Sequence, residues 1–315
     1  MQSNGILVVG SANMDLVVMA ERFPQPGETV FGNRFEMFPG GKGANQAVAA
    51  AKLGAETYFV GKMGNDEFHA ILSSNMKKEG VNCKHLLVDQ KFRTGTALIS
   101  INAQGENEII VISGSNMNLN PDDIETHRKL FSEIKIVLTQ LEIPVDTIIR
   151  TAQLTKAAGK IFILNPAPAR DLPDDLFAII DFLTPNQKEL EHLSGERIDD
   201  LESAERGARR LLERGVGNVI ITLGAQGAFL INSSECRIFP ARKVKPIDTT
   251  AAGDAFNGAL AYALSIDQPL KQAIVFANTV AAFSVTRLGA QSSMPSMEEL
   301  MKFNPAINFQ EEEII

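Results

Sequence analysis

Short hydrophobic runs recur along the chain, and between them apolar residues return every three or four positions. Apolar runs bounded by turn residues predict buried strands, which we place at residues 6–10, 57–60, 136–140, 161–164, 182–184 and 219–223. The stretches of helical period predict helices over 44–53, 66–79, 144–158, 187–193 and 203–214. This alternation indicates repeated βαβ units. It therefore predicts a doubly wound α/β fold, with a mostly parallel sheet and helices on both faces.

Two stretches depart from this alternation and predict a small β-sheet lid. Residues 97–102 and 107–113 flank a turn at 103–106, as in a β-hairpin, and 17–19 with 29–35 supply neighbouring strands. We expect these strands to pair antiparallel. Because the lid segments, about 16–38 and 95–113, are discontinuous, we expect the lid to be inserted into a single domain spanning residues 1–315.

Composition and charge narrow the class of protein. The chain is 44% hydrophobic and 22% charged, which is typical of a globular protein. It has no apolar run near 18 residues and no basic segment leading into a signal core, so we expect a cytoplasmic protein without a membrane partner. Two cysteines are too few for a disulfide framework. Thirty Lys and Arg are scattered among 38 Asp and Glu, which argues against nucleic acid as a partner.

A glycine-rich segment, residues 39–46, runs directly into an alanine-rich helix. Glycines permit close backbone approach, and free N–H groups at a helix start favour an electron-rich ligand. Lys42 and Asn45 add donors that suit sugar hydroxyls. The segment is not a Walker A loop, because Gly43 follows Lys42 and Glu36 stands where the first glycine should be. A purely structural glycine turn remains an alternative.

A second segment, residues 248–259, places small residues before another helix. The backbone amides of Ala251, Ala252 and Gly253 could converge on a developing anion, with the helix dipole behind them. Asp254 would lie in the first helical turn. It is either a base that accepts the proton of an attacking hydroxyl or a carboxylate that stabilises the helix, and these residues alone leave both interpretations open.

Asn13 and Asp15 follow the first predicted strand. Parallel sheets bind ligands at the carboxyl ends of their strands, and two residues spaced by two face the same side when extended. The pair could therefore hold a polyol. The alternative is an ordinary Asn/Asp turn.

Taken together, residues 40–47 with Gly54 and Gly64, and residues 248–260, resemble the two signatures of the ribokinase-like family of carbohydrate kinases. The resemblance spans essentially the whole chain and includes the pieces GGKGANQAVAA, LNPAPAR, ITLG and DTTAAGDAFNGAL. It implies a doubly wound α/β domain with a β-sheet lid, and ATP-dependent phosphorylation of D-ribose to D-ribose 5-phosphate. The alternatives are another sugar or nucleoside kinase of this family, such as a 2-deoxyribose kinase, and a sugar-binding regulator without catalysis.

The resemblance also implies a role for individual residues. It makes Asp254 the general base and gives the anion hole to Ala251, Ala252 and Gly253. The pentose would be held by Asn13, Asp15, Gly41, Lys42, Gly43, Asn45, Glu142 and Asp254. ATP with Mg²⁺ would be held by Asn186, Glu189, Thr222, Gly224, Gly227, Gly253 and Asn278. An activating K⁺ would lie among Asp248, Thr250, Ser284, Arg287, Gly289 and Ser293, several of them acting through backbone carbonyls.

Two further expectations follow. Many family members carry glycine where Ala251 or Ala252 stands, and alanine can serve there only if both of its backbone angles are ordinary. The apolar lid strands have open edges and faces that need cover, which predicts a homodimer joined through the lids.

Overall fold

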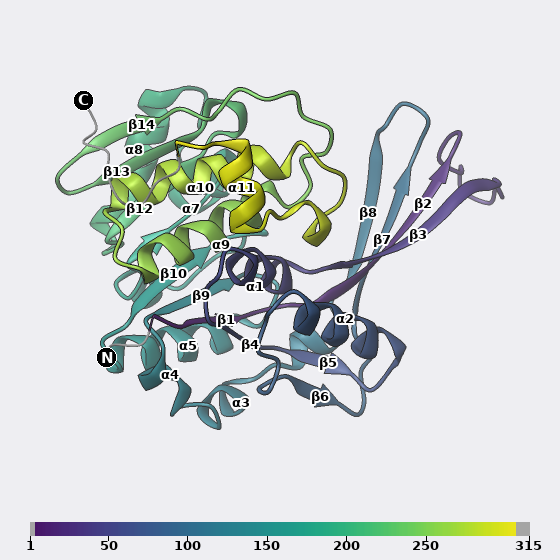
Figure 1. Cartoon of the computed structure of the whole chain (residues 1–315), viewed down its shortest axis with the longest axis horizontal. Coiled ribbons are helices and arrows are strands. Elements are labelled where there is room, and N and C mark those ends of the chain that lie inside the picture. The colour runs from purple at the N-terminus through teal and green to yellow at the C-terminus, as the bar shows by residue number, and fades with distance from the viewer. Residues whose placement is uncertain (1–3, 307–315) are drawn as a thin grey trace.

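The computed structural model describes residues 4–306 and is built around an eight-stranded sheet (Figure 1). Its strand order is β14-β13-β12-β11-β10-β9-β1-β4. The strands are β1 (Ile6–Val9), β4 (Thr57–Val60), β9 (Ile136–Gln140), β10 (Ile161–Asn165), β11 (Phe182–Leu183), β12 (Asn218–Thr222), β13 (Ala228–Asn232) and β14 (Cys236–Phe239). All neighbours from β4 to β12 are parallel, and β13 and β14 continue the sheet antiparallel.

Successive side chains of a strand face opposite sides of the sheet, so each strand serves two cores. Ile6 and Val8 of β1 pack into one, and Leu7 and Val9 into the other. The first core lies under α1 (Lys42–Lys52), α2 (Glu67–Lys78), α9 (Ala252–Ser265), α10 (Leu270–Ser284) and α11 (Met297–Phe303). The second lies under α3 (Pro121–Glu125), α4 (Leu130–Glu133), α5 (Val145–Ala157), α6 (Asp174–Phe177), α7 (Gln187–Ser194) and α8 (Leu201–Glu213).

The predicted α/β architecture is confirmed, and each predicted strand and helix is present with ends that differ by a few residues. The sequence pattern did not predict the antiparallel edge β13–β14, helix α10 or the small sheet of β5 (Lys62–Gly64) and β6 (Leu87–Asp89). Short 3₁₀ helices are η1 (Gly114–Asn118), η2 (Gly224–Gln226) and η3 (Gln291–Ser293). No helix within residues 4–306 is long and apolar enough to cross a membrane.

The lid is a four-stranded sheet, in the order β3-β2-β7-β8, that projects from the body (Figure 1). Its strands are β2 (Asn13–Ala20), β3 (Gly32–Gly40), β7 (Gly95–Ile101) and β8 (Asn107–Ile112). The prediction of an antiparallel lid is wrong for one pair, because β2 and β7 are parallel. Both strands start at the body, where Asn13 pairs with Gly95, and both run outward.

Candidate active site

The carboxyl ends of the parallel strands and the start of α9 enclose a polar pocket of about 200 Å³. Most of its lining comes from residues that the sequence signatures contain or flank. The lining residues are Lys42, Asn165, Ala167, Thr184, Asn186, Glu189, Thr222, Thr249, Ala251, Ala252, Gly253, Asp254 and Asn257. The segments from the two ends of the chain meet here, as the sequence predicts for ligand sites of parallel sheets.

Asp254 lies in the first turn of α9 and its side chain is almost completely buried. The Asn45 Nδ2 donates to its Oδ2 at 2.9 Å, and the Gln46 Nε2 donates to its Oδ1 at 2.9 Å. Burial raises the pKa of this carboxyl, although the nearby Lys42 ammonium and the two amides act in the opposite direction. A carboxylate with a raised pKa accepts a proton more readily than a solvated one. Gln46 belongs to the glycine-rich segment, but its sequence position alone does not reveal this contact.

The first backbone N–H groups of α1 already have hydrogen-bond acceptors within the protein. Glu142 Oε2 accepts the Lys42 backbone N–H at 3.1 Å and the Ser11 hydroxyl at 2.6 Å. Ser11 in turn accepts the N–H of Gly43 through its hydroxyl and the N–H of Ala44 through its carbonyl. The prediction of free N–H groups for a ligand is therefore wrong at these three positions. Glu142 supplies the negative charge that a helix N-terminus favours, and no pattern in the sequence indicates Ser11 as its partner.

The glycines of this segment have a packing explanation. Helix α1 begins at Lys42, not at residue 44, so most of the expected turn is helical. Gly41 has φ of 86°, and a Cβ there would lie 2.6 Å from the Asn13 backbone nitrogen. A Cβ at Gly43 would lie 2.6 Å from the Ser11 nitrogen. The close approach that the glycines permit is thus between α1 and the β1–β2 turn.

Asn13 and Asp15 lie within lid strand β2 and not in a turn, which corrects the turn alternative. They face the same side, as their spacing predicts. Asn13 is buried, and its Oδ1 accepts from the Nδ2 of Asn116, a residue of η1 that no sequence motif indicates. Burial, reinforced by the charges of Glu142 and Asp254, raises the pKa of Asp15 to about 7. The first lid strand therefore carries polar groups into the site.

Lys42 is surrounded by carboxylates. Burial lowers the pKa of its ammonium group, but Asp254, Glu142, Glu189 and Asp15 together outweigh that effect and raise it. Four acidic side chains act on one basic one, so the site has an excess of negative charge when they are ionised. An anionic ligand would need accompanying cations to bind here.

The segment before α9 differs from the expectation. Ala251 has φ of 58° and ψ of 16°, so it adopts the left-handed conformation, in which a side chain costs roughly 1–2 kcal/mol. The condition of ordinary backbone angles is therefore not met at this residue. The N–H of Ala252 donates to the Thr249 carbonyl at 3.3 Å and is therefore not a free member of the predicted anion hole. The loop closes on itself in a tight turn just before the helix begins.

Asn186 and Glu189 form a capping box at the start of α7. The Asn186 Oδ1 accepts the Glu189 N–H at 2.9 Å, and Glu189 accepts both the backbone N–H and the Nδ2 of Asn186 at 2.8 Å. Burial raises the pKa of Glu189, although the Asn186 amide and Lys42 oppose it. The spacing N-x-x-E is the sequence signal for this box.

The other predicted nucleotide residues divide between two places. Thr222 ends β12 and lines the pocket, and Gly224 and Gly227 begin and follow η2 with φ of 56° and 101°. Asn278 is buried in α10, and its Nδ2 donates to the Phe239 carbonyl at 2.9 Å. Its amide N–H is used within the protein, and the residue does not line the pocket described above.

The predicted cation segments do come together. The Asp248 carboxylate accepts the Thr250 N–H through one oxygen and the Gly289 N–H through the other, both at 2.9 Å. The hydroxyls of Ser284 and Ser293 donate to carbonyls of their own turns, at Ala281 and Ala290. The Arg287 side chain turns to Glu299, at 2.7 Å. Asp248 therefore joins the two segments.

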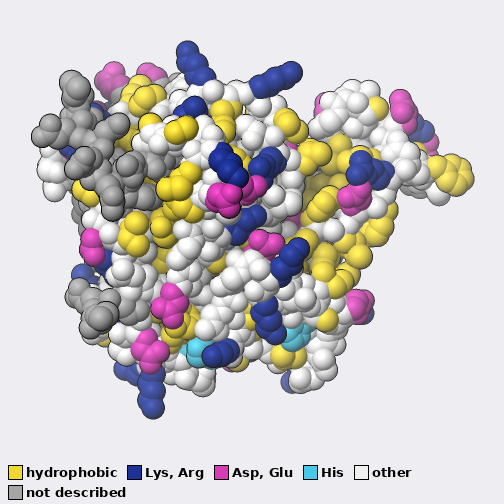
Figure 2. Space-filling model, viewed as in Figure 1, with side chains coloured by type: hydrophobic (Ala, Val, Ile, Leu, Met, Phe, Trp, Pro, Cys, Tyr) yellow, Lys and Arg dark blue, Asp and Glu magenta, His cyan; other side chains and the backbone are white. Residues whose placement is uncertain are grey.

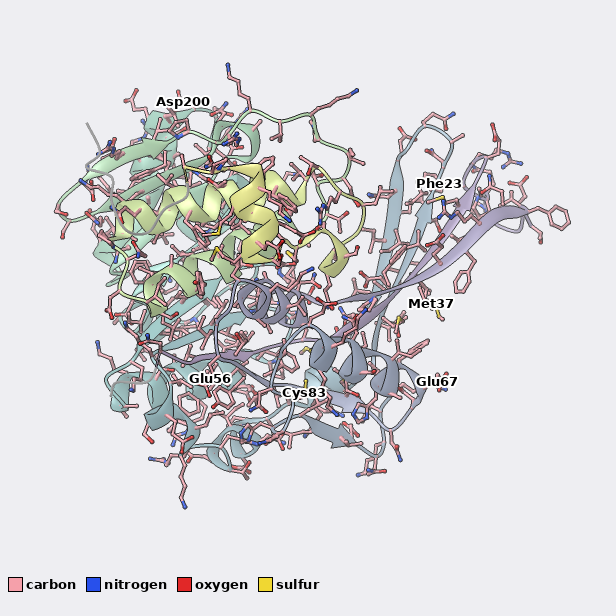
Figure 3. The ribbon with its side chains drawn as sticks, in the orientation of Figure 1. Phe23, Met37, Glu56, Glu67, Cys83 and Asp200 are labelled. Carbon is pink, nitrogen blue, oxygen red and sulfur yellow. The ribbon has the colours of Figure 1, made fainter. Side chains whose placement is uncertain are left out.

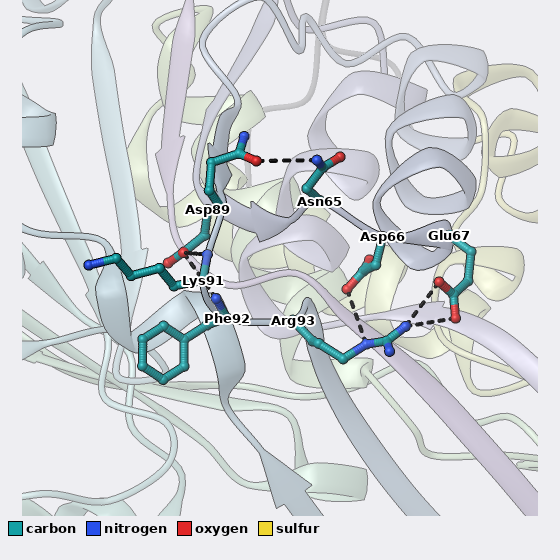
Figure 4. A pocket seen from close by; sticks show the side chains of 8 residues that line it. Asn65, Asp66, Glu67, Asp89, Lys91, Phe92 and Arg93 are labelled. Atoms are coloured by element: carbon teal, nitrogen blue, oxygen red, sulfur yellow. Dashed lines mark hydrogen bonds and ion pairs between the residues drawn. The ribbon is translucent and has the colours of Figure 1, made fainter.

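A second cavity, of about 350 Å³, lies between 65–67 and 89–93 (Figure 4). Its acidic side chains are held within the protein, because Arg93 contacts Asp66 and Glu67, and Asp89 accepts the backbone N–H groups of Lys91 and Phe92. Within residues 4–306 no group of three or more His, Cys, Asp and Glu side chains could hold a metal ion. We assign this cavity no chemistry.

Residues 3–297 match the profile of the pfkB family of carbohydrate kinases. The chain belongs to this family. A ribokinase from Haemophilus influenzae is 39% identical over 298 residues, which cover 95% of this chain and 97% of that protein. A deoxyribokinase from Salmonella typhi is 36% identical over 303 residues, covering 95% and 98%.

Solved structures of this family of kinases have the same fold. A ribokinase from Thermotoga maritima superposes with a TM-score of 0.88 at 43% identity, over 95% of this chain and 98% of that one. A ribokinase from Arabidopsis thaliana, in complex with ribose and ATP, superposes with a TM-score of 0.91 at 32% identity, over 98% and 100%. The carbohydrate kinase fold thus covers the body and lid of this chain.

Proposed function

We propose that this carbohydrate kinase is a ribokinase, which transfers the γ-phosphoryl group of ATP to the 5-hydroxyl of D-ribose. The observation that carries the proposal is the buried Asp254 at the start of α9, held by two side-chain amides beside Lys42. The similarity to ribokinases over nearly the whole chain supports the choice of ribose.

Asp254 would accept the proton of the 5-hydroxyl as the hydroxyl oxygen attacks the γ-phosphorus. Asn45 and Gln46 fix both carboxylate oxygens, so the base needs little reorganisation when the sugar arrives. Backbone N–H groups at a helix start lack partners within the helix and favour negative charge. Those at the start of α9, including Gly253, would stabilise the charge that develops on the transferred group.

Asn13 and Asp15 would hold hydroxyls of the pentose. A site that uses buried polar groups to bind a hydroxyl rejects an analogue without it, because those groups lose their partner. We therefore expect ribose to be preferred over 2-deoxyribose by roughly 10²- to 10⁴-fold in kcat/KM. A deoxyribokinase among the relatives makes this the sharpest distinction within the family.

Mg²⁺ would enter with ATP. Glu189 lines the pocket, and its carboxylate has lone pairs beyond those that cap α7, so it suits a hydrated divalent cation near the phosphates. The excess of acidic side chains around Lys42 favours the same conclusion. When bound, Mg²⁺ would neutralise phosphate charge. Asn186, Thr222, Gly224 and Gly227 would lie along the nucleotide.

K⁺ would fit the two segments that Asp248 joins. The serine hydroxyls there donate within their own turns, and the Arg287 guanidinium points to Glu299. Carbonyl oxygens and the Asp248 carboxylate therefore remain as ligands for the cation. We expect activation by K⁺ and little by Na⁺ at equal ionic strength, with Mg²⁺ fixed. Equal rates in both salts and in a bulky organic cation would contradict this site.

A second copy of the chain would cover the lid. Hydrophobic side chains gather along it (Figure 2), and Met37 lies there with Phe23 (Figure 3). Cross-strand register places one apolar set on the face opposite Asn13 and Asp15, and each member is more than a third exposed. The set is Val18, Phe35, Met37, Leu98, Ile110 and Ile112. Such a face favours association in water, and we infer a homodimer of a cytoplasmic enzyme.

The test is a steady-state assay of ADP release with ribose, 2-deoxyribose, fructose and adenosine. The ribokinase proposal expects the highest kcat/KM with ribose. A ratio near one between ribose and 2-deoxyribose would favour the deoxyribose kinase, and no turnover with any sugar would favour a binding protein without catalysis.

A further inference from the structure

A chain of side-chain amides leads away from Asp254 toward the surface. The Asn45 Nδ2 donates to Asp254 at 2.9 Å, and the Asn45 Oδ1 accepts from the Gln291 Nε2 at 3.1 Å. The Gln291 Oε1 accepts from the Asn75 Nδ2 at 2.7 Å. Asn45 and Gln291 are buried, and Asn75 is half-buried. This chain of amides connects residues of α9, α1, η3 and α2, which lie far apart in sequence.

The direction of every bond in this chain is set by the carboxylate. An ionised aspartate only accepts hydrogen bonds, so Asn45 must present its NH₂ group to Asp254. Its oxygen then faces Gln291, which must present NH₂ in turn. The Gln291 oxygen consequently faces Asn75, which must also donate. Reversing any one amide would leave two oxygens or two NH₂ groups facing each other.

A second chain of amides starts at the same carboxylate and shows how strongly the carboxylate fixes the direction of the hydrogen bonds. The Gln46 Nε2 donates to Asp254, so the Gln46 oxygen accepts from the Gln140 Nε2, at 2.6 Å. The Gln140 Oε1 is left buried with no hydrogen-bond partner, one of only two such side-chain atoms within residues 4–306. A buried acceptor without a hydrogen-bond partner is unfavourable. The fold keeps this arrangement although it is costly.

We propose that Gln291 and Asn75 are positioning residues, which hold Asn45 with its N–H toward the base. This rests on the proposed kinase function. Gln291 lies in η3, within the segment that Asp248 ties to its own loop through Gly289, so the chain also connects that segment to the base. A cavity of about 200 Å³ opens beside Asn75 and Gln291, next to Phe38 and Pro39 at the root of the lid. The outer end can therefore be changed without opening the core.

The test compares Asn75→Asp with Asn75→Ala. Aspartate preserves the shape of the side chain but can only accept hydrogen bonds, so Gln291 must turn its NH₂ group toward residue 75. Asn45 must then turn its own NH₂ group toward Gln291. As a result, the Asn45 oxygen faces the Asp254 carboxylate. Alanine removes the last donor, and water can replace it. We expect kcat to fall roughly 10- to 100-fold in Asn75→Asp and by less than about threefold in Asn75→Ala, with KM for ATP unchanged in both.

Ser74→Asp is the matched control, because it adds the same charge at the exposed neighbouring position of α2. The proposal expects near-normal kcat for this variant. It is overturned if Asn75→Ala is as slow as Asn75→Asp, which would indicate packing, or if Ser74→Asp is equally slow, which would indicate charge alone.

Thermal unfolding of each variant accompanies the kinetics. If Asn75→Asp does not fold, Gln291→Glu and Gln291→Met give the same comparison: a slower Glu variant supports the chain, and a Met variant as slow or slower overturns it. Absence of sugar phosphorylation by the wild-type protein would instead contradict the proposed function, so the two failures are distinguishable.

Discussion

Replacing Asp15 with asparagine should stabilise the protein in a way that depends on pH. The pKa of Asp15 is about 7 in the fold against a reference of 3.8, because burial and the charges of Glu142 and Asp254 disfavour its ionised form. At about 1.36 kcal/mol per pKa unit, the difference is roughly 4 kcal/mol. The folded state binds this proton more tightly than the unfolded state. The wild type therefore loses stability as pH rises from about 4 to 7, and the loss levels off above 7.

The assay is urea unfolding of wild type and Asp15→Asn between pH 5 and 8.5. Asparagine keeps the size of the side chain but does not ionise, so its stability advantage should grow by about 2–3 kcal/mol over this range and then reach a plateau. Ribose binding should weaken in the same variant. The gain in stability and the weaker ribose binding would have one cause, because the Asp15 carboxylate lies at a buried position that is unfavourable for folding.

Asp66→Asn is the control of opposite sign. Asp66 is also desolvated, but it caps α2 and accepts from Thr94 and the His69 N–H, and these hydrogen bonds lower its pKa. It is ionised in both states above pH 5, so Asp66→Asn should destabilise by an amount that does not change between pH 5 and 8.5. An advantage of Asp15→Asn that is equally flat with pH would refute the reasoning.

Four further outcomes are expected. Asp254→Asn should lower kcat by roughly 10²- to 10⁴-fold because it removes the basic group; a variant with near-normal kcat would exclude Asp254 as the base. Ala251→Gly should relieve the left-handed backbone and raise the unfolding free energy by up to about 1 kcal/mol, measured by urea unfolding. Phe35→Glu should yield monomers in sedimentation equilibrium at micromolar protein, whereas a wild type that is already monomeric would remove the lid dimer. Asn13→Met should reduce the preference for ribose over 2-deoxyribose mainly by slowing ribose, and an unchanged kcat/KM ratio would show that Asn13 does not bind the 2-hydroxyl.

The architecture was predictable from sequence because buried strands and amphipathic helices leave a local apolar pattern. The hydrogen bonds between polar side chains of the site were less predictable, because the partners are distant in the chain. Gln291 and Asn45 are 246 positions apart, and neither has a neighbour that indicates the other. The glycines of 40–43 predict a close backbone approach, but only the fold shows that the approaching backbone is that of the β1–β2 turn. Local pattern also could not show that Ala251 takes a conformation that glycine adopts at lower cost.

The amides that hold Asp254 carry hydrogen bonds but do not titrate. A histidine or a chain of hydroxyls could pass a captured proton deeper into the protein, whereas Asn45 and Gln46 can only orient the carboxylate. In the proposed reaction, the proton taken from the sugar would therefore have to leave by the mouth through which the phosphorylated product departs. Deprotonation of Asp254 and release of the product would then be one event. An enzyme that released its product slowly would also keep Asp254 protonated.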